Sequence, residues 1–534
     1  MKNIINKLKK IVGAEWVRDD SLSRYYYASD VMTHFGQGAL YPENRPLAIV
    51  FPDSAKQIQA IVNLARKNDL PIYPVGGGTV LLIGSIPGKP DSGITIDFHR
   101  MQKIGVDKER LTVRAQPGAT GLQVSQLIRE MDIGFRPYFG GSPGSSLFVP
   151  YMVFTGQNKM AGYQDGMGIN CVCGMELVLA SGEIVKTGSM ASKESPAWPH
   201  GPGPALTFLP FFANGGYGIV TEMEFRFFPT PEEVTSLWVT FPTLKSAVNA
   251  MYEVMTKEYA CGATVMGPGC WTHALYSSSH WQEGAHFVKS TQDINLIGMS
   301  FRGSPAKAAF EHGAASRILE NYGGVVMPPW MVAILDGHEE NAAGWQQCNS
   351  PKICGTFTGK SDSGGIFVSG GVFDSLEKLE DYMIRGMEIY QRVSQENPDF
   401  LNHPHPTLRL YASCGQTYLA MGGHANAAGE VIFVVDYAKR EFLPAVGAIK
   451  AQFDTLIEEI GMTPLGVGRD KRTWTECPAL AATREPGPNA LPTSQWLRYL
   501  RKRLIPVISC LPGFPSLCLN RPVTRRLFGS GETL

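Results

Sequence analysis

The feature that most constrains this chain is a strand, a helix and a second strand that lead into three consecutive glycines. Residues 47–52 (LAIVFP) form an apolar run typical of a buried strand, and a helix with one apolar face is predicted to begin at Asp53. The run IYPV at 72–75 predicts the second strand, which enters the glycines at 76–78. Consecutive glycines expose backbone N–H groups without a Cβ in the way, which suits a pyrophosphate. Taken alone, however, such a triplet is more often a structural turn.

The glycine loop matches neither of the two common phosphate-binding patterns. It is not G-x-G-x-x-G, the fingerprint of Rossmann domains, and it is not G-x-x-x-x-G-K-[ST], the P-loop. A second loop rich in Gly and Ser lies downstream at 140–146. Two such loops in one region of alternating strands and helices favour a dinucleotide that is held along loops.

Length, charge and cysteine usage exclude several classes of protein. The 534 residues suggest two or three domains. Lys plus Arg and Asp plus Glu both number 48, and the zero net charge argues against a nucleic-acid partner. The ten Cys form no C-x-x-C motif, so reduced structural thiols are expected. The basic N-terminus lacks an apolar signal core, which predicts a short amphipathic helix and a cytoplasmic protein. A peripheral membrane contact by the segment 504–520 is the alternative to its packing on the core.

Several phrases in the first 230 residues carry a family resemblance. In chain order they are RPLAIVFPDSAKQIQAIVNLARKNDLPIYPVGGGT, TIDFHRMQKI, TVRAQPGAT, CGMELVLASGEIVKTG and GYGIVTEMEFRFFP. With these phrases the chain resembles the vanillyl-alcohol oxidase / 4-cresol dehydrogenase superfamily, the FAD-linked oxidases with a PCMH-type FAD-binding domain. The resemblance implies an α+β fold. It consists of an FAD-binding domain of two α/β subdomains and a cap domain with an antiparallel sheet flanked by helices.

The resemblance, together with a change to longer strand–helix units near residue 230, also divides the chain. Residues 1–231 are expected to form the FAD-binding domain, with a core of about 41–231. Residues 232–474 are expected to form the substrate or cap domain. The segment 475–534 would return to the FAD-binding domain, because YLRKRLIPVISCLPG looks like a degenerate form of the family's last phrase.

The cofactor that the resemblance implies is FAD. Its pyrophosphate would lie on the glycine loop, and the rest of it would lie along the second loop and two later strands. The predicted cofactor-binding residues are Pro74, Val75, Gly76, Gly77, Gly78, Thr79, Gly141, Ser142, Gly174 and Ile219. Simple strand packing is an equally good explanation for Gly174 and Ile219. Non-covalent FAD is expected, because no His directly follows the first glycine loop and residues 348–371 contain neither Tyr nor His.

The residues with which the family binds phenols are mostly absent. Ile83 and Gly468 stand where phenol-oxidising members have two tyrosines, and Met167 stands where they have a carboxylate base, whereas Arg469 is kept. This pattern argues against oxidation of 4-alkylphenols. Sister members that oxidise 2-hydroxy acids carry a metal-binding GH-x-G-x-G-N-x-H phrase. Here Val431 replaces its second His, so no metal is expected.

The expected activity is FAD-dependent oxidation of an alcohol, a hydroxy acid or a benzylic C–H group by hydride transfer to flavin. Arg469 would hold an anionic group of the substrate, with a surface ion pair as an equal alternative. Asp165 or Tyr163 would act as base or hydrogen-bonding group, although Asp165 in Gln-Asp-Gly is more typical of a turn.

Two other functions and several partners stay open. The chain could be a catalytically degenerate flavin-binding relative, or a non-oxidative flavoenzyme of the same superfamily. The expected partners are a small-molecule substrate and an electron acceptor, which is oxygen, a cytochrome or a quinone. A homodimer is a further expectation, since members of the family are often dimers.

Overall fold

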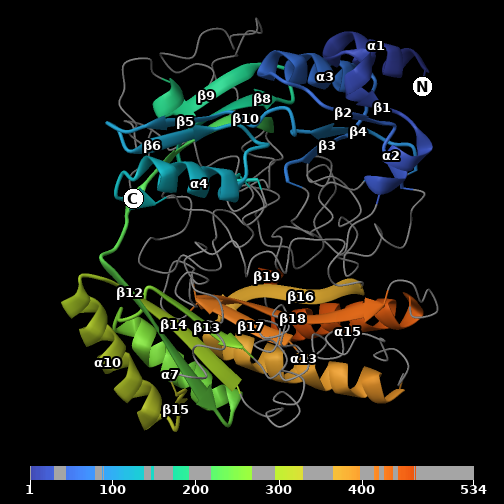
Figure 1. Ribbon diagram of the computed structural model, residues 1–534. Helices are drawn as coiled ribbons and strands as arrows, with labels where there is room; N and C mark the ends of the chain where they lie inside the picture. The colour runs from blue at the N-terminus through green and yellow to red at the C-terminus, as the bar shows by residue number, and fades with distance from the viewer. Residues whose placement is uncertain are drawn as a thin grey trace, which may run out of the picture.

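The computed structural model describes the chain in thirteen parts, which carry sheets of four, five, two and eight strands. The described residues are 2–28, 44–77, 87, 90–136, 146–148, 172–191, 218–266, 295–328, 365–396, 414–419, 426–436, 443–461 and 463–464. Figure 1 shows the strands β1 to β10 in an upper part and the large sheet in a lower part. The chain changes from one part to the other between β11 (Phe228–Pro229) and β12 (Glu233–Phe241), beside the predicted boundary at residue 231.

The first sheet has four strands in the order β1-β2-β4-β3. Their bounds are Val17–Arg18 for β1, Ala48–Val50 for β2, Ile72–Val75 for β3 and Ile94–Asp97 for β4. β4 runs parallel to both of its neighbours, whereas β1 is antiparallel to β2. The carboxyl ends of the parallel strands therefore meet at one edge of the sheet, where the glycine loop begins.

Three helices complete this first unit, and two of them bury apolar faces on the sheet. α1 (Lys2–Val12) and α3 (Ala55–Lys67) share a core with the strands, and α2 (Ser21–Tyr26) begins after its N-cap Asp20. The side chains buried in α3 are Ile58, Ile61, Val62, Leu64 and Ala65. The helices predicted at the N-terminus and after Asp53 are therefore present.

The second sheet has five strands in the order β5-β6-β10-β8-β9, all antiparallel. Its strands are β5 (Ile104–Asp107), β6 (Thr112–Ala115), β8 (Val172–Leu179), β9 (Ile184–Gly188) and β10 (Gly218–Arg226). α4 (Gly121–Met131) covers one face, and Val124 and Ile128 of this helix are buried in the shared core (Figure 1). β7 (Phe135–Arg136) pairs with β11. β8 and β9 form the predicted hairpin, which turns at Gly182 with φ +89°.

The large sheet has eight strands in the order β15-β12-β14-β13-β17-β18-β16-β19. The strands that follow β12 are β13 (Gly262–Met266), β14 (Asn295–Gly303), β15 (Val325–Val326), β16 (Gly365–Ser375), β17 (Cys414–Leu419), β18 (Asn426–Asp436) and β19 (Thr463–Pro464). All the pairings of this sheet are antiparallel. The expectation of an antiparallel sheet flanked by helices is thus met.

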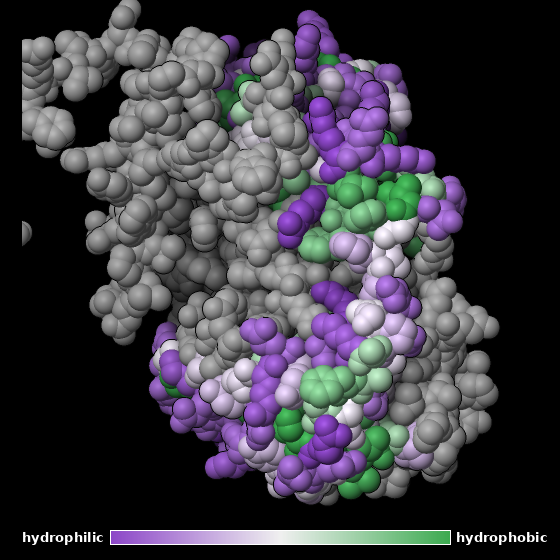
Figure 2. Space-filling view, turned by 90° about the vertical axis from the view of Figure 1, so that its left-hand side faces the viewer, coloured by the Kyte–Doolittle hydropathy of each residue, from purple (hydrophilic) through white to green (hydrophobic). Residues whose placement is uncertain are grey.

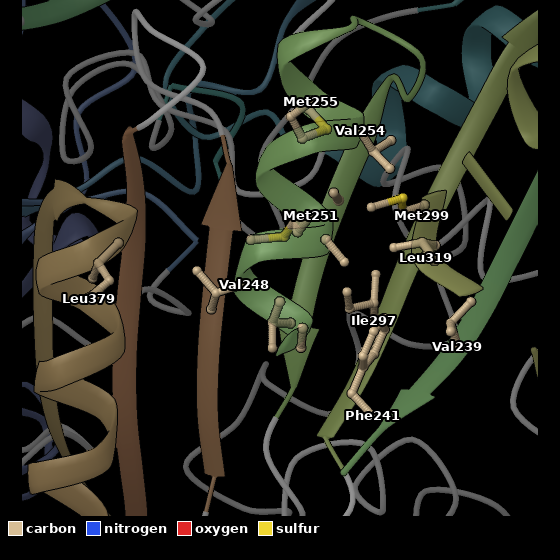
Figure 3. Close-up of a cluster of buried hydrophobic side chains, with 14 of the residues drawn as sticks. Val239, Phe241, Val248, Met251, Val254, Met255, Ile297, Met299, Leu319 and Leu379 are labelled. Atoms are coloured by element: carbon tan, nitrogen blue, oxygen red, sulfur yellow. The ribbon is translucent and has the colours of Figure 1, made fainter. Parts of the chain in front are cut away.

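Four helices pack on one face of the large sheet. They are α7 (Leu244–Thr256), α10 (Pro305–Asn321), α13 (Leu376–Glu396) and α15 (Leu443–Ile460). Side chains of all four meet in one core, part of which Figure 3 shows: Met251, Val254 and Met255 of α7 lie beside Ile297 and Met299 of β14. Figure 1 shows these helices on the side of the sheet away from the upper part. The face without helices is therefore turned towards the first two sheets.

The surface of the described residues is mixed. Figure 2 shows hydrophobic residues as separate patches among hydrophilic ones on one side of the molecule. Large exposed apolar side chains include Phe310 on α10 and Val325 on β15. Among the described residues, no helix combines the length and the apolar composition that a membrane crossing requires.

Candidate functional site: the edge of the first sheet

The first glycines of the predicted phosphate loop leave the sheet where two parallel strands end. Val75, the last residue of β3, is the register partner of Asp97, the last residue of β4. Gly76 and Gly77 follow directly and are half-buried. Ligands of open sheets with parallel strands bind outside these carboxyl ends, so the loop stands at the edge where a ligand is expected.

Gly76 lies so close to the second loop that no other residue fits. A Cβ on Gly76 would lie 2.6 Å from the Cβ of Ser146 and 3.4 Å from the carbonyl oxygen of Pro117. Ser146 is itself fixed, because its hydroxyl donates to Pro117 O at 2.5 Å and accepts from the N–H of Phe148 at 3.2 Å. The structure thus brings the end of the second Gly/Ser-rich loop against the start of the first.

Gly118 makes a second close backbone contact, with the turn that follows β4. A Cβ on Gly118 would lie 2.1 Å from the carbonyl oxygen of Phe98, and the Gly118 N–H donates to Met101 O at 2.9 Å. The N–H of Phe98 in turn donates to the carbonyl oxygen of Val75 at 3.1 Å. Backbone contacts therefore link the end of β3, the turn after β4 and the segment before α4. These contacts fix the backbone from which the glycine loop begins, at the edge where a pyrophosphate is expected to bind.

Packing explains Gly174 and Ile219, the two predicted cofactor residues on the second sheet. A Cβ on Gly174 would lie 2.5 Å from the carbonyl oxygen of Thr187 on the neighbouring strand β9. Ile219 on β10 pairs with Val178 of β8, and it packs against the core of the first sheet. Close packing alone accounts for both residues, and their contact with a cofactor stays a prediction.

The other predicted site residues divide into two groups. Pro74 is exposed on β3 and Val75 is buried, so these two lie beside the glycine loop. The rest lie outside the described residues: Gly78, Thr79, Gly141, Ser142, Tyr163, Asp165 and Arg469. Ile83, Met167 and Gly468 lie outside them as well. Within the part of the chain that the structure describes, no group of three or more His, Cys, Asp or Glu could hold a metal ion.

A buried carboxylate at the same edge was not expected from the sequence. The side chain of Asp97 is 1% exposed and accepts hydrogen bonds from the hydroxyl of Tyr27 and, at 2.9 Å, from the N–H of His99. The ring of His99 contacts the same carboxylate through Nδ1. Burial and the carboxylate raise the pKa of Tyr27, and the hydrogen bond to Asp97 raises the pKa of His99. The sequence did offer one signal of this carboxylate. Asp97 is the charged residue that ends the buried strand ITID, which pairs with the strand that leads into the glycine loop.

The second sheet holds another buried carboxylate, which is fully engaged in the fold. Glu224 on β10 accepts from Ser189 at 2.6 Å and from Thr112 at 3.2 Å, and Arg114 lies 3.5 Å away. Burial, followed by the charge of Glu224, raises the pKa of the Cys173 thiol to about 12. A thiol that keeps its proton is typical of a buried structural cysteine, the kind that the sequence predicts.

Comparisons with known proteins identify an FAD binding domain in the part of the chain that contains this edge. Residues 46–188 match the model of the FAD binding domain family. The chain is 27% identical over 209 residues to the D-lactate dehydrogenase of Archaeoglobus fulgidus, which covers 39% of this chain and 45% of that protein. It is 25% identical over 260 residues to the glycolate oxidase subunit GlcD of Bacillus subtilis. This match covers 48% of this chain and 51% of that protein. The chain thus spans about half the length of these curated relatives.

The fold of the whole chain is also found in solved structures. The crystal structure of p-cresol methylhydroxylase with substrate bound superposes with a TM-score of 0.70 over 95% of this chain and 93% of that chain, at 16% sequence identity. The fold, the adjoining loops and the matched domain define a flavoprotein that binds FAD. The matched domain, the relatives and the shared fold together support the superfamily of FAD-linked oxidases with a PCMH-type FAD-binding domain. The predicted family, fold class and cofactor are confirmed.

Proposed function

We propose that this protein is an FAD-dependent oxidoreductase that oxidises an alcohol, a hydroxy acid or a benzylic C–H group by hydride transfer to flavin. The observation that carries the proposal is the contact of Gly76 with Ser146, which joins the two predicted cofactor loops within the matched FAD binding domain. Two relatives are named D-lactate dehydrogenase and glycolate oxidase subunit, so a 2-hydroxy acid is the first substrate class to test.

Bound FAD would supply the two-electron oxidation itself. The chain's own residues would bind the cofactor, orient the substrate and cover both. The backbone N–H groups of Gly76 and Gly77 would hold the pyrophosphate at the edge of the first sheet. The large sheet turns its helix-free face towards this edge, and that face would cover the substrate (Figure 1). Exclusion of water from such a site strengthens every polar contact within it.

The proposed substrate contacts are those that the sequence predicts. Arg469 would bind the carboxylate of a hydroxy acid through two parallel N–H donors. Asp165 or Tyr163 would accept the hydroxyl proton or hold the hydroxyl group by a hydrogen bond. FAD is proposed to be non-covalent, since the sequence offers no His directly after the first glycine loop and neither Tyr nor His at 348–371. The electron acceptor is left as oxygen, a cytochrome or a quinone.

The first experiment is an absorbance spectrum of the purified protein before and after acid precipitation. Flavin bands in the protein, with flavin released into the supernatant, support non-covalent FAD, whereas yellow colour that stays in the pellet contradicts it. Protein that is colourless and takes up no added FAD would sink the proposal.

The second experiment separates the three functions. The flavin absorbance is followed without oxygen while D-lactate, L-lactate, glycolate or benzyl alcohol is added. Bleaching by one of these compounds supports the oxidation, and a preference for one lactate enantiomer supports a substrate bound in a fixed orientation. A flavin that none of them reduces favours the catalytically degenerate relative. Turnover without net change of the flavin absorbance favours non-oxidative chemistry.

A further inference from the structure

The carboxylate of Asp97 is buried beside the glycine loop, and the proposed oxidation assigns no role to it. It is 1% exposed, and it belongs to the residue paired with Val75, directly before the first glycine of the cofactor loop. A buried carboxylate next to a site for a diphosphate opposes the binding of that anion, unless a positive charge offsets it. A neighbouring group must therefore offset the negative charge of Asp97 if a diphosphate is to bind at this edge.

Tyr27 ties the carboxylate to the N-terminal part of the chain. Its hydroxyl donates to one carboxylate oxygen of Asp97 across a sequence separation of 70 residues. Tyr27 follows the short helix α2, whose Arg24 donates to the carbonyl oxygen of Pro46 at 2.7 Å. Because burial and the carboxylate raise the pKa of Tyr27, the phenol keeps its proton and remains a donor. The carboxylate is thus held in one orientation.

His99 supplies the other two contacts and the offsetting charge. Its N–H and its ring Nδ1 both reach the second carboxylate oxygen, and its side chain is 61% exposed. With a proton on both ring nitrogens, His99 and Asp97 together carry no net charge. When His99 loses a proton, the pair carries one negative charge beside the glycine loop.

The arginines near Asp97 and His99 are each paired with a carboxylate. The titratable or charged side chains of the neighbouring elements are Arg24, Tyr25, Tyr26, Asp53, Tyr73, Asp91 and Arg100. Arg24 is paired with Asp91, and Arg100 is paired with Asp53 at 2.8 Å. Arginine, tyrosine and paired carboxylates do not ordinarily titrate between about pH 6 and pH 9, whereas histidine does. Among these described groups, His99 thus sets how the local charge changes in this range.

We propose that Tyr27, Asp97 and His99 form a positioning cluster for the diphosphate of bound FAD. Tyr27 and the His99 backbone fix the carboxylate behind the glycine loop, and the protonated His99 ring cancels its charge. The inference rests on the FAD-binding site at this edge and not on the identity of the substrate. It requires that FAD binds more tightly when His99 is protonated than when it is neutral.

The test is the dissociation constant of FAD, measured by titrating apoprotein and following flavin fluorescence from about pH 6 to pH 9. The constant of the native chain is expected to rise about tenfold as pH rises through the titration of His99. His99→Gln is expected to bind weakly at every pH and to lose this slope. His312→Gln, which changes the same residue type on α10 of the other part, is expected to keep the native slope.

Tyr27→Phe gives an independent check. Without the phenolic donor, Asp97 holds the proton of His99 more strongly, so the midpoint of the slope is expected to move to higher pH. A native slope in His99→Gln, or an unchanged midpoint in Tyr27→Phe, overturns the cluster. If circular dichroism shows His99→Gln to be unfolded, the midpoint in Tyr27→Phe decides alone. Absence of FAD binding by the native chain contradicts the cofactor site itself and not the cluster alone.

Discussion

The two parts of the molecule use backbone proximity in different ways. In the upper part, Gly76 and Gly118 lie against other loops, where a Cβ would meet Ser146 and the carbonyl oxygen of Phe98. In the lower part, Gly324 ends the segment after α10, and a Cβ there would meet the side chains of Val239 and Phe241 in the core. The first contacts fix the loops of the proposed binding edge, whereas the second one completes a hydrophobic core.

This difference explains why the family model matches residues of the upper part. A loop that must approach a cofactor tolerates few residues at each position, and the matched family model covers 46–188, the region of these glycines. The described helices and strands of the lower part require apolar side chains of suitable volume, which many sequences provide. Many different sequences can thus form the fold of the lower part.

The largest effect is expected from Phe301→Ala in the core of the lower part. Phe301 is 0% exposed on β14, and its loss should cost about 3–5 kcal/mol of unfolding free energy. If the two parts act separately, the thermal transition of the lower part falls while the dissociation constant of FAD stays the same. Phe310→Ala on α10 is the control, since Phe310 is 62% exposed and should cost much less. Loss of FAD binding in Phe301→Ala would break the comparison.

A smaller effect on stability but a larger one on the cofactor is expected from Gly118→Ala. The new Cβ would lie 2.1 Å from Phe98 O, and the displacement of backbone should cost about 1–3 kcal/mol. The same displacement moves Val75 and the glycine loop, so FAD binding should weaken at least about tenfold. Gly105→Ala on β5 is the matched control, because nothing lies within 4 Å of its added Cβ. Equal FAD binding in the two variants would show that the backbone frame does not shape the site.

Sequence patterns predicted those features whose cause is local. The helix after Asp53 and the hairpin at Gly182 were predicted from an apolar face and a Ser-Gly turn, and both are present. The predicted cap is not seen, because Ser54 at the N-cap of this helix makes no side-chain capping hydrogen bond. The contact of Tyr27 with Asp97 was not predictable in this way, because it joins residues 70 positions apart. The catalytic assignment of Arg469, Asp165 and Tyr163 lies outside the described residues and stays a prediction.

An effect of about 1 kcal/mol is expected from Thr243→Ala at the start of α7. The hydroxyl of Thr243 accepts from the N–H of Ser246 at 3.2 Å and caps the helix, so its removal leaves this donor to solvent. The thermal transition of the lower part should fall slightly, and Thr243→Ser should restore it because serine keeps the hydroxyl. FAD binding should stay unchanged in both variants. A change in FAD affinity would show that the cofactor edge senses even small losses in the lower part.

The smallest effect is a dependence of the upper part's stability on pH. The hydrogen bond to Asp97 raises the pKa of His99 above its unfolded value of about 6.5. The stabilisation by this contact is therefore fully present below that value, and it is lost as pH rises through the higher pKa of the folded state. Because the ring is 61% exposed, solvent screens the contact, and the melting temperature of apoprotein should change by about a degree or less. Differential scanning calorimetry of the native chain and His99→Gln at about pH 6 and pH 8 measures this difference. A native chain that gains stability relative to His99→Gln as pH rises would reverse the sign and show that the neutral ring is the form that the fold holds.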